Sequence, residues 1–451
     1  MTLDPGVFKA YDVRGVYGTE IDEAGAELIG RAFPGVAGAT RIVVGHDCRL
    51  SSPSIAAAFV KGAREAGADV CELGLAATEM VYFAVAEGGY DGGAAITASH
   101  NPPKYTGAKM VLAGAVPLSG DAGIGEVGRR AMNGDLPLAD TPGTLTRDDT
   151  LTERFIEACL KFVDVSKITG LRVVMDAANG MAGRYLPGVI ERLDIDVVPY
   201  FLELDGNFPN HEPNPLLEEN REFIEAKVVE DKADLGIAWD GDADRCFFID
   251  DAGNFVPGDF LTALLADHIL RQHGPSTIVY DLRASWAVRD AVIAAGGTPD
   301  EFRVGHAFIK RRMREVDAIF AGEVSGHYYF KDFSFADTGL IPALLILELL
   351  ATSGKKLSEL IAGFRAKYHI SGEINSTVAD SPAVLQRLRE RYADGTQTEQ
   401  DGLSVAYEDW HFNVRSSNTE PLVRLNLESL VSEADMERRR DEVLAIIREG
   451  A

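Results

Sequence analysis

The chain is short of cysteine, of basic residues and of long apolar runs. Its four cysteines (Cys48, Cys71, Cys159 and Cys246) lie far apart and form no CxxC pair, so neither a zinc cluster nor a disulfide framework is indicated. Only 44 basic residues stand against 70 acidic ones, a net charge of −26. Nucleic acids and anionic membranes need a basic face, so neither is expected as a partner.

Signals for secretion and membrane insertion are also lacking. The N-terminus has no basic segment followed by an apolar one. The longest apolar stretch, 340–351, contains Pro342 and Glu348 and is too short to cross a bilayer. We therefore predict a cytoplasmic protein, and both a monomer and a homodimer remain open.

The alternation of strand-type and helix-type segments predicts the fold class. With 451 residues the chain has enough core for several domains. Segments typical of strands (41–45, 171–175, 235–239, 277–280) alternate with segments typical of helices (52–66, 218–230). Such alternation favours α/β units with parallel or mixed sheets. The C-terminal part of the chain differs. Short strands at 403–407, 411–415 and 422–427 precede an amphipathic helix at 433–448. This pattern predicts a separate α+β domain.

A weak internal repeat supports several similar domains. Asp91, Asp234 and Asp317 each precede a short apolar strand, and each strand leads into a polar loop containing glycine. Because ligands of open α/β sheets bind at the carboxyl ends of strands, we expect these loops to face a common site.

Two of these loops carry the chemistry. The segment 96–102 places Ser99 in a polar turn after an apolar strand, and 240–245 places Asp240, Asp242 and Asp244 at alternate positions before Arg245. Hard carboxylate oxygens suit Mg²⁺. An EF-hand is excluded, because its sixth and twelfth positions would hold Arg245 and Asp251 instead of Gly and Glu. A hydroxyl beside a carboxylate cluster is typical of a magnesium-assisted phosphoryl carrier.

Taken in order, the motifs resemble one family closely. The segments 97–102 (TASHNP), 240–245 (DGDADR), 322–327 (GEVSGH) and 415–421 (RSSNTEP) are similar to the four active-site loops of the α-D-phosphohexomutase superfamily. The segments 8–15 (FKAYDVRG), 205–211 (DGNFPNH) and 304–306 (VGH) match as well. The similarity is strongest to the bacterial phosphomannomutase/phosphoglucomutase branch.

This resemblance implies roles for individual residues. Ser99 carries the phosphoryl group, His100 lies beside the reacting oxygens, Lys109 is the general acid/base and Arg245 bridges substrate and phosphoserine. Mg²⁺ is held by Asp240, Asp242, Asp244 and an oxygen of phospho-Ser99. We expect nearby cations to lower the pKa of Lys109. The segment 46–49 (HDCR) is less basic than its family counterpart and receives no catalytic role.

Other loops are expected to bind the sugar and its distal phosphate. Glu323 and Ser325 read the 3- and 4-hydroxyls, with His327, His306 and Arg283 nearby, while Gly322 and Gly326 permit close backbone approach. The phosphate clamp is assigned to Arg415, Ser417, Asn418, Thr419 and Arg424. Tyr11 and Arg14 are further candidates for the cleft.

The implied architecture has four domains around one central cleft. We place α/β domains at 1–147, 148–252 and 253–366, carrying the phosphoserine, metal and sugar loops, and an α+β domain with the phosphate loop at 367–451. The implied function is reversible phosphoryl transfer between the 1- and 6-positions of mannose or glucose phosphate. It proceeds through a hexose 1,6-bisphosphate, which also acts as the activator.

Three alternatives remain. A phosphoglucosamine mutase would carry Gln where Val324 stands. A metal phosphatase would need a second Cys/His or Asp/His metal cluster, and the sequence reveals none. A sugar-bisphosphate-binding regulator on a mutase scaffold is disfavoured, because Ser99, Lys109 and the three aspartates are all intact.

Overall fold

The computed structural model describes residues 2–120, 123–134, 136, 138–416 and 422–449, which form two compact units. The first unit comprises Met1–Val256, Met313–Phe320 and Ser325–Leu357. The second comprises Pro257–Arg312, Ala321–Val324 and Ser358–Ala451. Within the described ranges, none of the helices has the length and apolar character needed to cross a membrane.

The first sheet carries the serine loop. It has the order β1-β5-β4-β2-β3-β7 with β6 beside β5, and it mixes parallel pairs such as β2–β4 with antiparallel pairs such as β4–β5. Its strands are β1 (Val13–Val16), β2 (Arg41–His46), β3 (Asp69–Leu75), β4 (Gly92–Ile96), β5 (Tyr105–Leu112), β6 (Val116–Pro117) and β7 (Leu145–Arg147).

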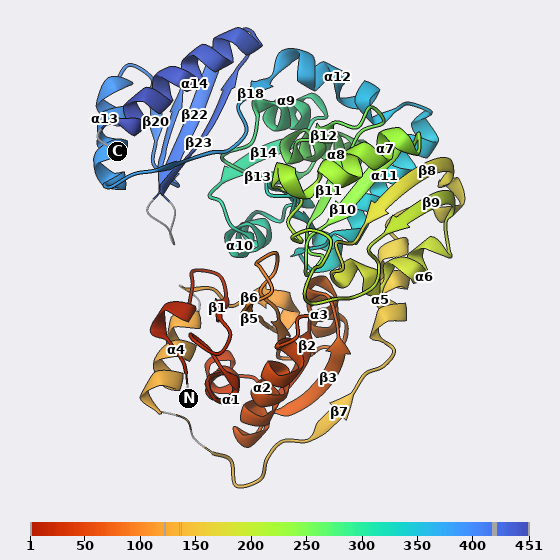
Figure 1. The fold of residues 1–451 in the computed structure, drawn as a ribbon, viewed down its shortest axis with the longest axis vertical. Helices are drawn as coiled ribbons and strands as arrows, with labels where there is room; N and C mark the ends of the chain where they lie inside the picture. The colour runs from red at the N-terminus through yellow and green to blue at the C-terminus, as the bar shows by residue number, and fades with distance from the viewer. Residues whose placement is uncertain (1, 121–122, 135, 137, 417–421, 450–451) are drawn as a thin grey trace. The chain divides into compact units, whose positions relative to one another are not determined.

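Helices cover both faces of this sheet. Helices α1 (Glu23–Ala37), α2 (Ser52–Glu65) and α4 (Ile124–Asn133) share one hydrophobic core with it, and α3 (Thr78–Glu87) covers the other face (Figure 1). Helices α1 and α2 cross closely because of two glycines. A Cβ atom on Gly30 would lie 2.1 Å from Phe59 O, and one on Gly62 would lie 2.0 Å from Glu27 O.

The second sheet carries the aspartate loop and has the order β12-β11-β10-β8-β9. Parallel strands β8, β9 and β10 are extended by the antiparallel hairpin of β11 and β12. Their bounds are Thr169–Asp176 (β8), Asp194–Tyr200 (β9), Leu235–Trp239 (β10), Cys246–Ile249 (β11) and Phe255–Val256 (β12). The helices in this part of the chain are α5 (Leu151–Leu160), α6 (Leu186–Ile190) and α7 (Glu222–Glu230).

The third sheet is also mixed, with the order β14-β13-β15-β16-β17. Its strands are β13 (Thr277–Asp281), β14 (Thr298–Phe302), β15 (Phe320–Gly322), β16 (Tyr328–Phe330) and β17 (Ala336–Asp337). The helices of this region are α8 (Gly258–His273), α9 (Trp286–Ala294), α10 (His306–Val316), α11 (Leu340–Ser353) and α12 (Leu357–Lys367).

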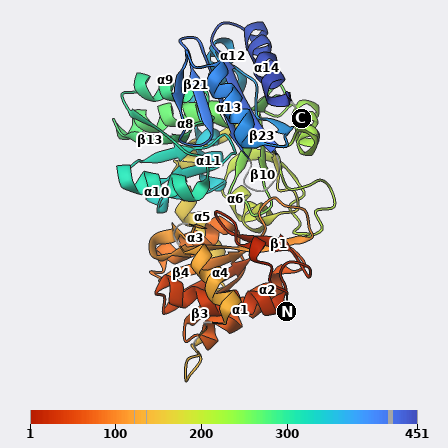
Figure 2. The ribbon, with the colours of Figure 1, turned by 90° about the vertical axis from the view of Figure 1, so that its left-hand side faces the viewer.

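The C-terminal sheet is wholly antiparallel, with the order β18-β23-β22-β21-β20 and β19 also beside β23. Its strands are β18 (His369–Ile370), β19 (Ile374–Thr377), β20 (Thr396–Thr398), β21 (Leu403–Ala406), β22 (Trp410–Ser416) and β23 (Leu422–Ser429). Helices α13 (Ser381–Arg391) and α14 (Glu433–Arg448) pack against one face (Figure 2). The predicted fold class, three mixed α/β sheets followed by an α+β domain, is confirmed.

Candidate active site

The proposed phosphoryl carrier sits on a strained, buried turn. Ser99 follows β4 by three residues, has φ +52° and is only 1% exposed. Thr97 Oγ1 accepts a hydrogen bond from the Ser99 amide at 2.9 Å and so fixes the turn. Positive φ at a non-glycine residue costs on the order of 1–3 kcal/mol and is concentrated at functional sites.

Arg49, to which the sequence assigned no role, holds the Ser99 turn in place through hydrogen bonds. Its buried guanidinium donates to the carbonyls of Ser99 at 2.7 Å, Asn101 at 2.6 Å and Pro102 at 2.8 Å, while Asp47 pairs with its Nε at 3.0 Å. The carbonyls lie about fifty positions away in the sequence, so no local pattern could reveal this contact. In the sequence, Arg49 is only a basic residue at the end of the segment 46–49, three positions before the helix that begins at Ser52.

We expect Arg49→Lys to impair catalysis more than sugar binding. One ammonium cannot reach three carbonyls and a carboxylate together, so the turn loosens and stability falls by about 1–3 kcal/mol. Steady-state kinetics should show at least about a tenfold lower kcat with little change in KM. Arg147→Lys, at an exposed ion pair with Asp149, is the matched control. An unchanged kcat in the Arg49 variant would contradict this positioning role.

Three buried carboxylates gather directly after β10. Asp240, Asp242 and Asp244 offer oxygens that lie within 4.8 Å of one another. Asp242 Oδ1 is buried without a hydrogen-bond partner among the described residues. Burial, together with the charges of Asp242 and Asp244, raises the pKa of Asp240 well above its ordinary value. Uncompensated carboxylate oxygens of this kind fit a divalent cation.

The two loops meet at the serine oxygen. Ser99 Oγ lies 3.3 Å from Asp240 Oδ2 and 3.2 Å from His100 Nδ1. Burial, followed by the nearby charges of Arg245 and Arg14, lowers the pKa of His100 well below its usual value, so the ring is neutral. A neutral imidazole and a carboxylate therefore face the same hydroxyl.

Lys109 joins the aspartates from β5. Its Nζ donates to Asp242 Oδ2 at 2.7 Å and to Asp244 Oδ2 at 2.5 Å. Burial opposes its charge, but Asp242 and Asp244 outweigh burial and hold the pKa of Lys109 above its usual value. The predicted direction was wrong for this structure, because the prediction counted nearby cations and omitted direct contacts with two carboxylates.

Arg245 and His327 complete this cluster. Arg245 Nε lies 3.5 Å from Asp240 Oδ2 and 3.2 Å from His327 Nε2. His327 Nδ1 in turn lies 3.0 Å from Ser325 Oγ. The sequence assigned His327 to the sugar, but the structure also brings it within 3.6 Å of Asp244 Oδ1.

A second group of possible metal ligands was missed. Asp244, His327 and Asp337 offer ligand atoms within 4.8 Å of one another. A metal phosphatase would need a group of this kind, and the sequence reveals none. These three residues lie on separate loops and strands, so their spacing in the sequence gave no sign of it.

Arg14 and Tyr11 lie at the start of the first domain. Arg14 Nη1 donates to Asn101 Oδ1 at 2.6 Å and Arg14 also pairs with Asp12, so it orients the residue two positions after Ser99. Tyr11 is half-buried, two residues before β1.

The second unit holds a separate polar cluster at the end of β13. Asp281 accepts from Arg283 at 2.9 and 2.8 Å and from the Val324 amide at 2.8 Å. Glu323, 1% exposed, accepts from the Gly305 amide at 2.9 Å, next to His306 at the start of α10. Glu323, which the sequence predicts to read the sugar, is thus held by a backbone amide.

Gly322 and Gly326, which the sequence predicts to permit close backbone approach, also have a packing role. A Cβ atom on Gly322 would lie 2.2 Å from Thr262 Oγ1, so this glycine accommodates packing against α8. Gly326 has φ +84°, and a Cβ there would lie 2.8 Å from the Phe247 ring. Both glycines therefore serve the packing of the loop within the protein.

The predicted phosphate clamp lies partly within the described chain. Arg415 on β22 and Arg424 on β23 are direct cross-strand partners, so their side chains share one face of the sheet. Both arginines contact Glu373, which the sequence did not single out. Ser417, Asn418 and Thr419 lie outside the described residues.

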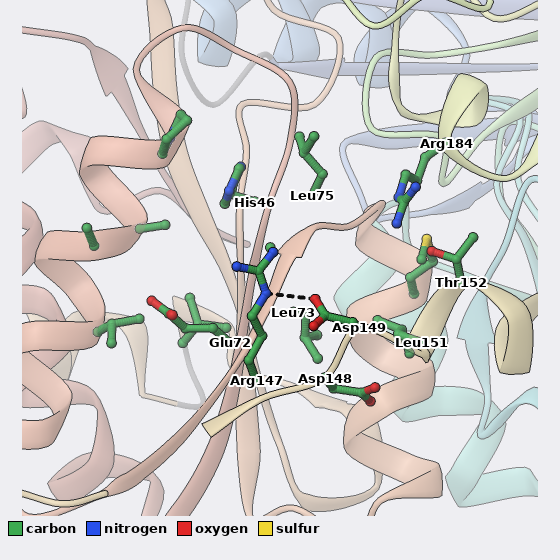
Figure 3. A pocket seen from close by; sticks show the side chains of 17 residues that line it. His46, Glu72, Leu73, Leu75, Arg147, Asp148, Asp149, Leu151, Thr152 and Arg184 are labelled. Carbon is green, nitrogen blue, oxygen red and sulfur yellow. Dashed lines mark hydrogen bonds and ion pairs between the residues drawn. The ribbon is translucent and has the colours of Figure 1, made fainter. Parts of the chain in front are cut away.

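A cavity of about 470 Å³ in the first unit is distinct from these clusters (Figure 3). Its lining includes His46, Glu72, Arg147 and Arg184 and none of the residues predicted for the active site. Arg147 and Asp149 pair at 2.7 Å on its wall (Figure 3). The residues predicted for the chemistry therefore lie outside this cavity.

The fold and the loops define an α/β enzyme of four domains, and comparison with known families gives its class. Successive segments match the phosphoglucomutase/phosphomannomutase models: alpha/beta/alpha domain I (5–130), II (153–253) and III (257–368), and the C-terminal domain (373–446). The chain belongs to this family, as its motifs predicted, and is an isomerase. The domain limits of 1–147, 148–252, 253–366 and 367–451 stay predictions.

Individual relatives span the whole chain. A phosphomannomutase of Salmonella montevideo is 44% identical over 448 residues, 98% of each chain. A protein of Xanthomonas campestris named phosphohexose mutases is 42% identical over 450 residues, covering 99% of this chain and 100% of the relative. The crystal structure of a phosphoglucomutase/phosphomannomutase family protein from Burkholderia thailandensis is 33% identical, with a TM-score of 0.89 over 100% of this chain and 99% of that one.

Proposed function

We propose that the protein interconverts the 1- and 6-phosphates of mannose and glucose through a phosphorylated Ser99. The contact of Ser99 Oγ with Asp240, at 3.3 Å beside two further buried carboxylates, carries this proposal. Phospho-Ser99 gives its phosphoryl group to the free hydroxyl of a hexose monophosphate. The hydroxyl loses a proton and the serine oxygen gains one, so a hexose 1,6-bisphosphate and free serine result.

The bisphosphate then turns within the site and presents its other phosphate to Ser99. The serine takes that phosphoryl group, and the isomeric monophosphate leaves. As the serine attacks, neutral His100 at 3.2 Å is placed to accept its proton, and protonated Lys109 is placed to act as an acid. Arg245 balances charge on the transferring group.

Magnesium is the cation that best suits this donor set. Asp240, Asp242 and Asp244 would hold it together with an oxygen of phospho-Ser99. When bound, the ion neutralises charge on the transferring phosphoryl group.

The non-reacting end of the substrate is assigned to the second cluster. Arg415 and Arg424 would hold the distal phosphate with Ser417, Asn418 and Thr419. Glu323 and Ser325 would read the sugar 3- and 4-hydroxyls, with Arg283 nearby. Mannose and glucose share those hydroxyls and differ at the 2-carbon. We therefore expect the protein to accept both mannose phosphates and glucose phosphates.

A substrate panel tests the assignment. With a trace of hexose 1,6-bisphosphate, we expect turnover of mannose 1-phosphate and glucose 1-phosphate with kcat/KM values within about tenfold of each other, and slower turnover of glucosamine 1-phosphate. Coupled assays of the 6-phosphate products measure this. Turnover of the amino sugar alone would identify a phosphoglucosamine mutase. Binding of the bisphosphate without turnover of any substrate would favour the regulator.

A further inference from the structure

Glu373 lies at the centre of three arginines. Its Oε2 is 3.2 Å from Arg283 Nη1 and 3.1 Å from Arg415 Nη2, and its Oε1 is 3.1 Å from Arg424 Nη1. Burial alone would raise the pKa of Glu373, but the three guanidinium groups outweigh it and lower the pKa to about 2. The side chain is therefore an anion at any physiological pH.

The position of Glu373 in the chain makes it available to the clamp. It directly precedes β19, whose partner strand β23 carries Arg424, and the register places Arg424 opposite Asn375. Arg415 and Arg424 face each other across β22 and β23, where two like charges would repel without a counter-anion. Glu373, a residue of the protein itself, supplies that counter-anion.

The arginines keep capacity for a second anion. The Nε groups of Arg415 and Arg424 are buried without hydrogen-bond partners among the described residues, so Glu373 does not use either guanidinium fully. Asp281 separately neutralises Arg283. Glu323 is a further anion near Arg283, so the capacity left for a phosphate lies in the free Nε groups of Arg415 and Arg424.

We propose that Glu373 is an exchangeable counter-anion: it takes over the clamp arginines when the substrate's phosphate leaves them. This proposal rests on the mutase function above, because a bisphosphate that must turn within the site has to leave the clamp during each cycle. A carboxylate that replaces the departing phosphate reduces the cost of that release. Glu373 is thereby a positioning residue that limits the affinity of the clamp.

A merely structural role predicts the opposite effect on phosphate binding. If Glu373 only holds the arginines in place, its removal loosens them and weakens binding. If Glu373 competes with phosphate, its removal strengthens binding, because the same arginines then face the anion without a rival. The sign of the change separates the two roles.

The test compares Glu373→Gln with the full-length wild type and uses inorganic phosphate as the probe. We expect the Gln variant to bind phosphate about tenfold more tightly in a thermal-shift titration, with a lower KM for hexose phosphate and a lower kcat. Glu373→Asp keeps the charge and should bind within about twofold of wild type. Glu408→Gln removes an exposed charge from the same domain and is the matched control.

Each outcome bears on the proposal. Unchanged or weaker phosphate binding in the Gln variant overturns it, as does an Asp variant that binds as tightly as the Gln variant. Glu373→Ala gives the same test of sign if the Gln variant does not fold. A wild type that binds phosphate but turns over no hexose phosphate would instead refute the proposed function, so the two failures are distinguishable.

Discussion

Replacing Ser99 with alanine is expected to lower kcat by about 10³-fold or more for every hexose phosphate that the wild type converts. The substitution removes the only oxygen through which the proposed phosphoryl group can pass. It also keeps the left-handed turn, since alanine and serine are similarly disfavoured at a φ of +52°. Arg49 still holds the Ser99 carbonyl, so the loop should keep its place.

Two measurements isolate the hydroxyl from the fold. Intact-protein mass spectrometry after incubation with hexose 1,6-bisphosphate should find one added phosphoryl group on the wild type and none on Ser99→Ala. Ser51→Ala removes another buried hydroxyl of the first unit, one without a hydrogen-bond partner among the described residues, and should keep full activity. Full activity in Ser99→Ala would contradict the proposed mechanism.

The local sequence pattern was enough to predict the strands that lead into these loops. The segment predicted at 235–239 is strand β10, and the helix predicted at 433–448 is α14, with the same bounds. The repeated acidic residue has a structural reason as well. Asp91 accepts from the Arg41 amide at 2.9 Å and Asp234 from the Arg172 amide at 2.8 Å, so in both domains it ties a central strand to the neighbouring strand.

One predicted helix is broken where local chemistry competes with the helical pattern. The segment 218–230 forms a 3₁₀ turn (Glu218–Asn220) and then α7 (Glu222–Glu230). Arg221 between them has φ −114°, and the Asn220 side chain donates to the Asn214 carbonyl at 3.1 Å. An asparagine that bonds to a nearby backbone group in this way favours a turn.

The parts of the site that escaped prediction all depend on partners distant in sequence. Arg49 was found only by its contacts with the Ser99 turn, and Glu373 only by its contacts with Arg283, Arg415 and Arg424. Arg49 lies in the segment 46–49, which received no role because it departs from the family pattern, and Glu373 lies outside the motifs. Family motifs identify the groups proposed to touch the reacting atoms, whereas supporting contacts become visible only when the chain is folded.

Asp240→Asn is expected to change activity and stability in opposite directions. The substitution removes a carboxylate from the proposed magnesium site and from its contact with Ser99 Oγ, so we expect kcat/KM to fall by about 10²- to 10³-fold. It also removes repulsion among three buried carboxylates, while Lys109 keeps its contacts with Asp242 and Asp244. The metal-free variant should therefore unfold at the same temperature as the metal-free wild type or at a higher one.

Magnesium titrations and thermal unfolding with and without a chelator measure both effects. The chelator should abolish wild-type activity, and added Mg²⁺ should restore it and raise the unfolding temperature. Both responses should shrink in Asp240→Asn and persist in Asp194→Asn, which removes an exposed charge from the same domain. A metal-free Asp240 variant that unfolds well below the wild type would mean that Asp240 holds the fold together through its contacts with Ser99 and Arg245, and that the repulsion inferred from its buried neighbours does not dominate.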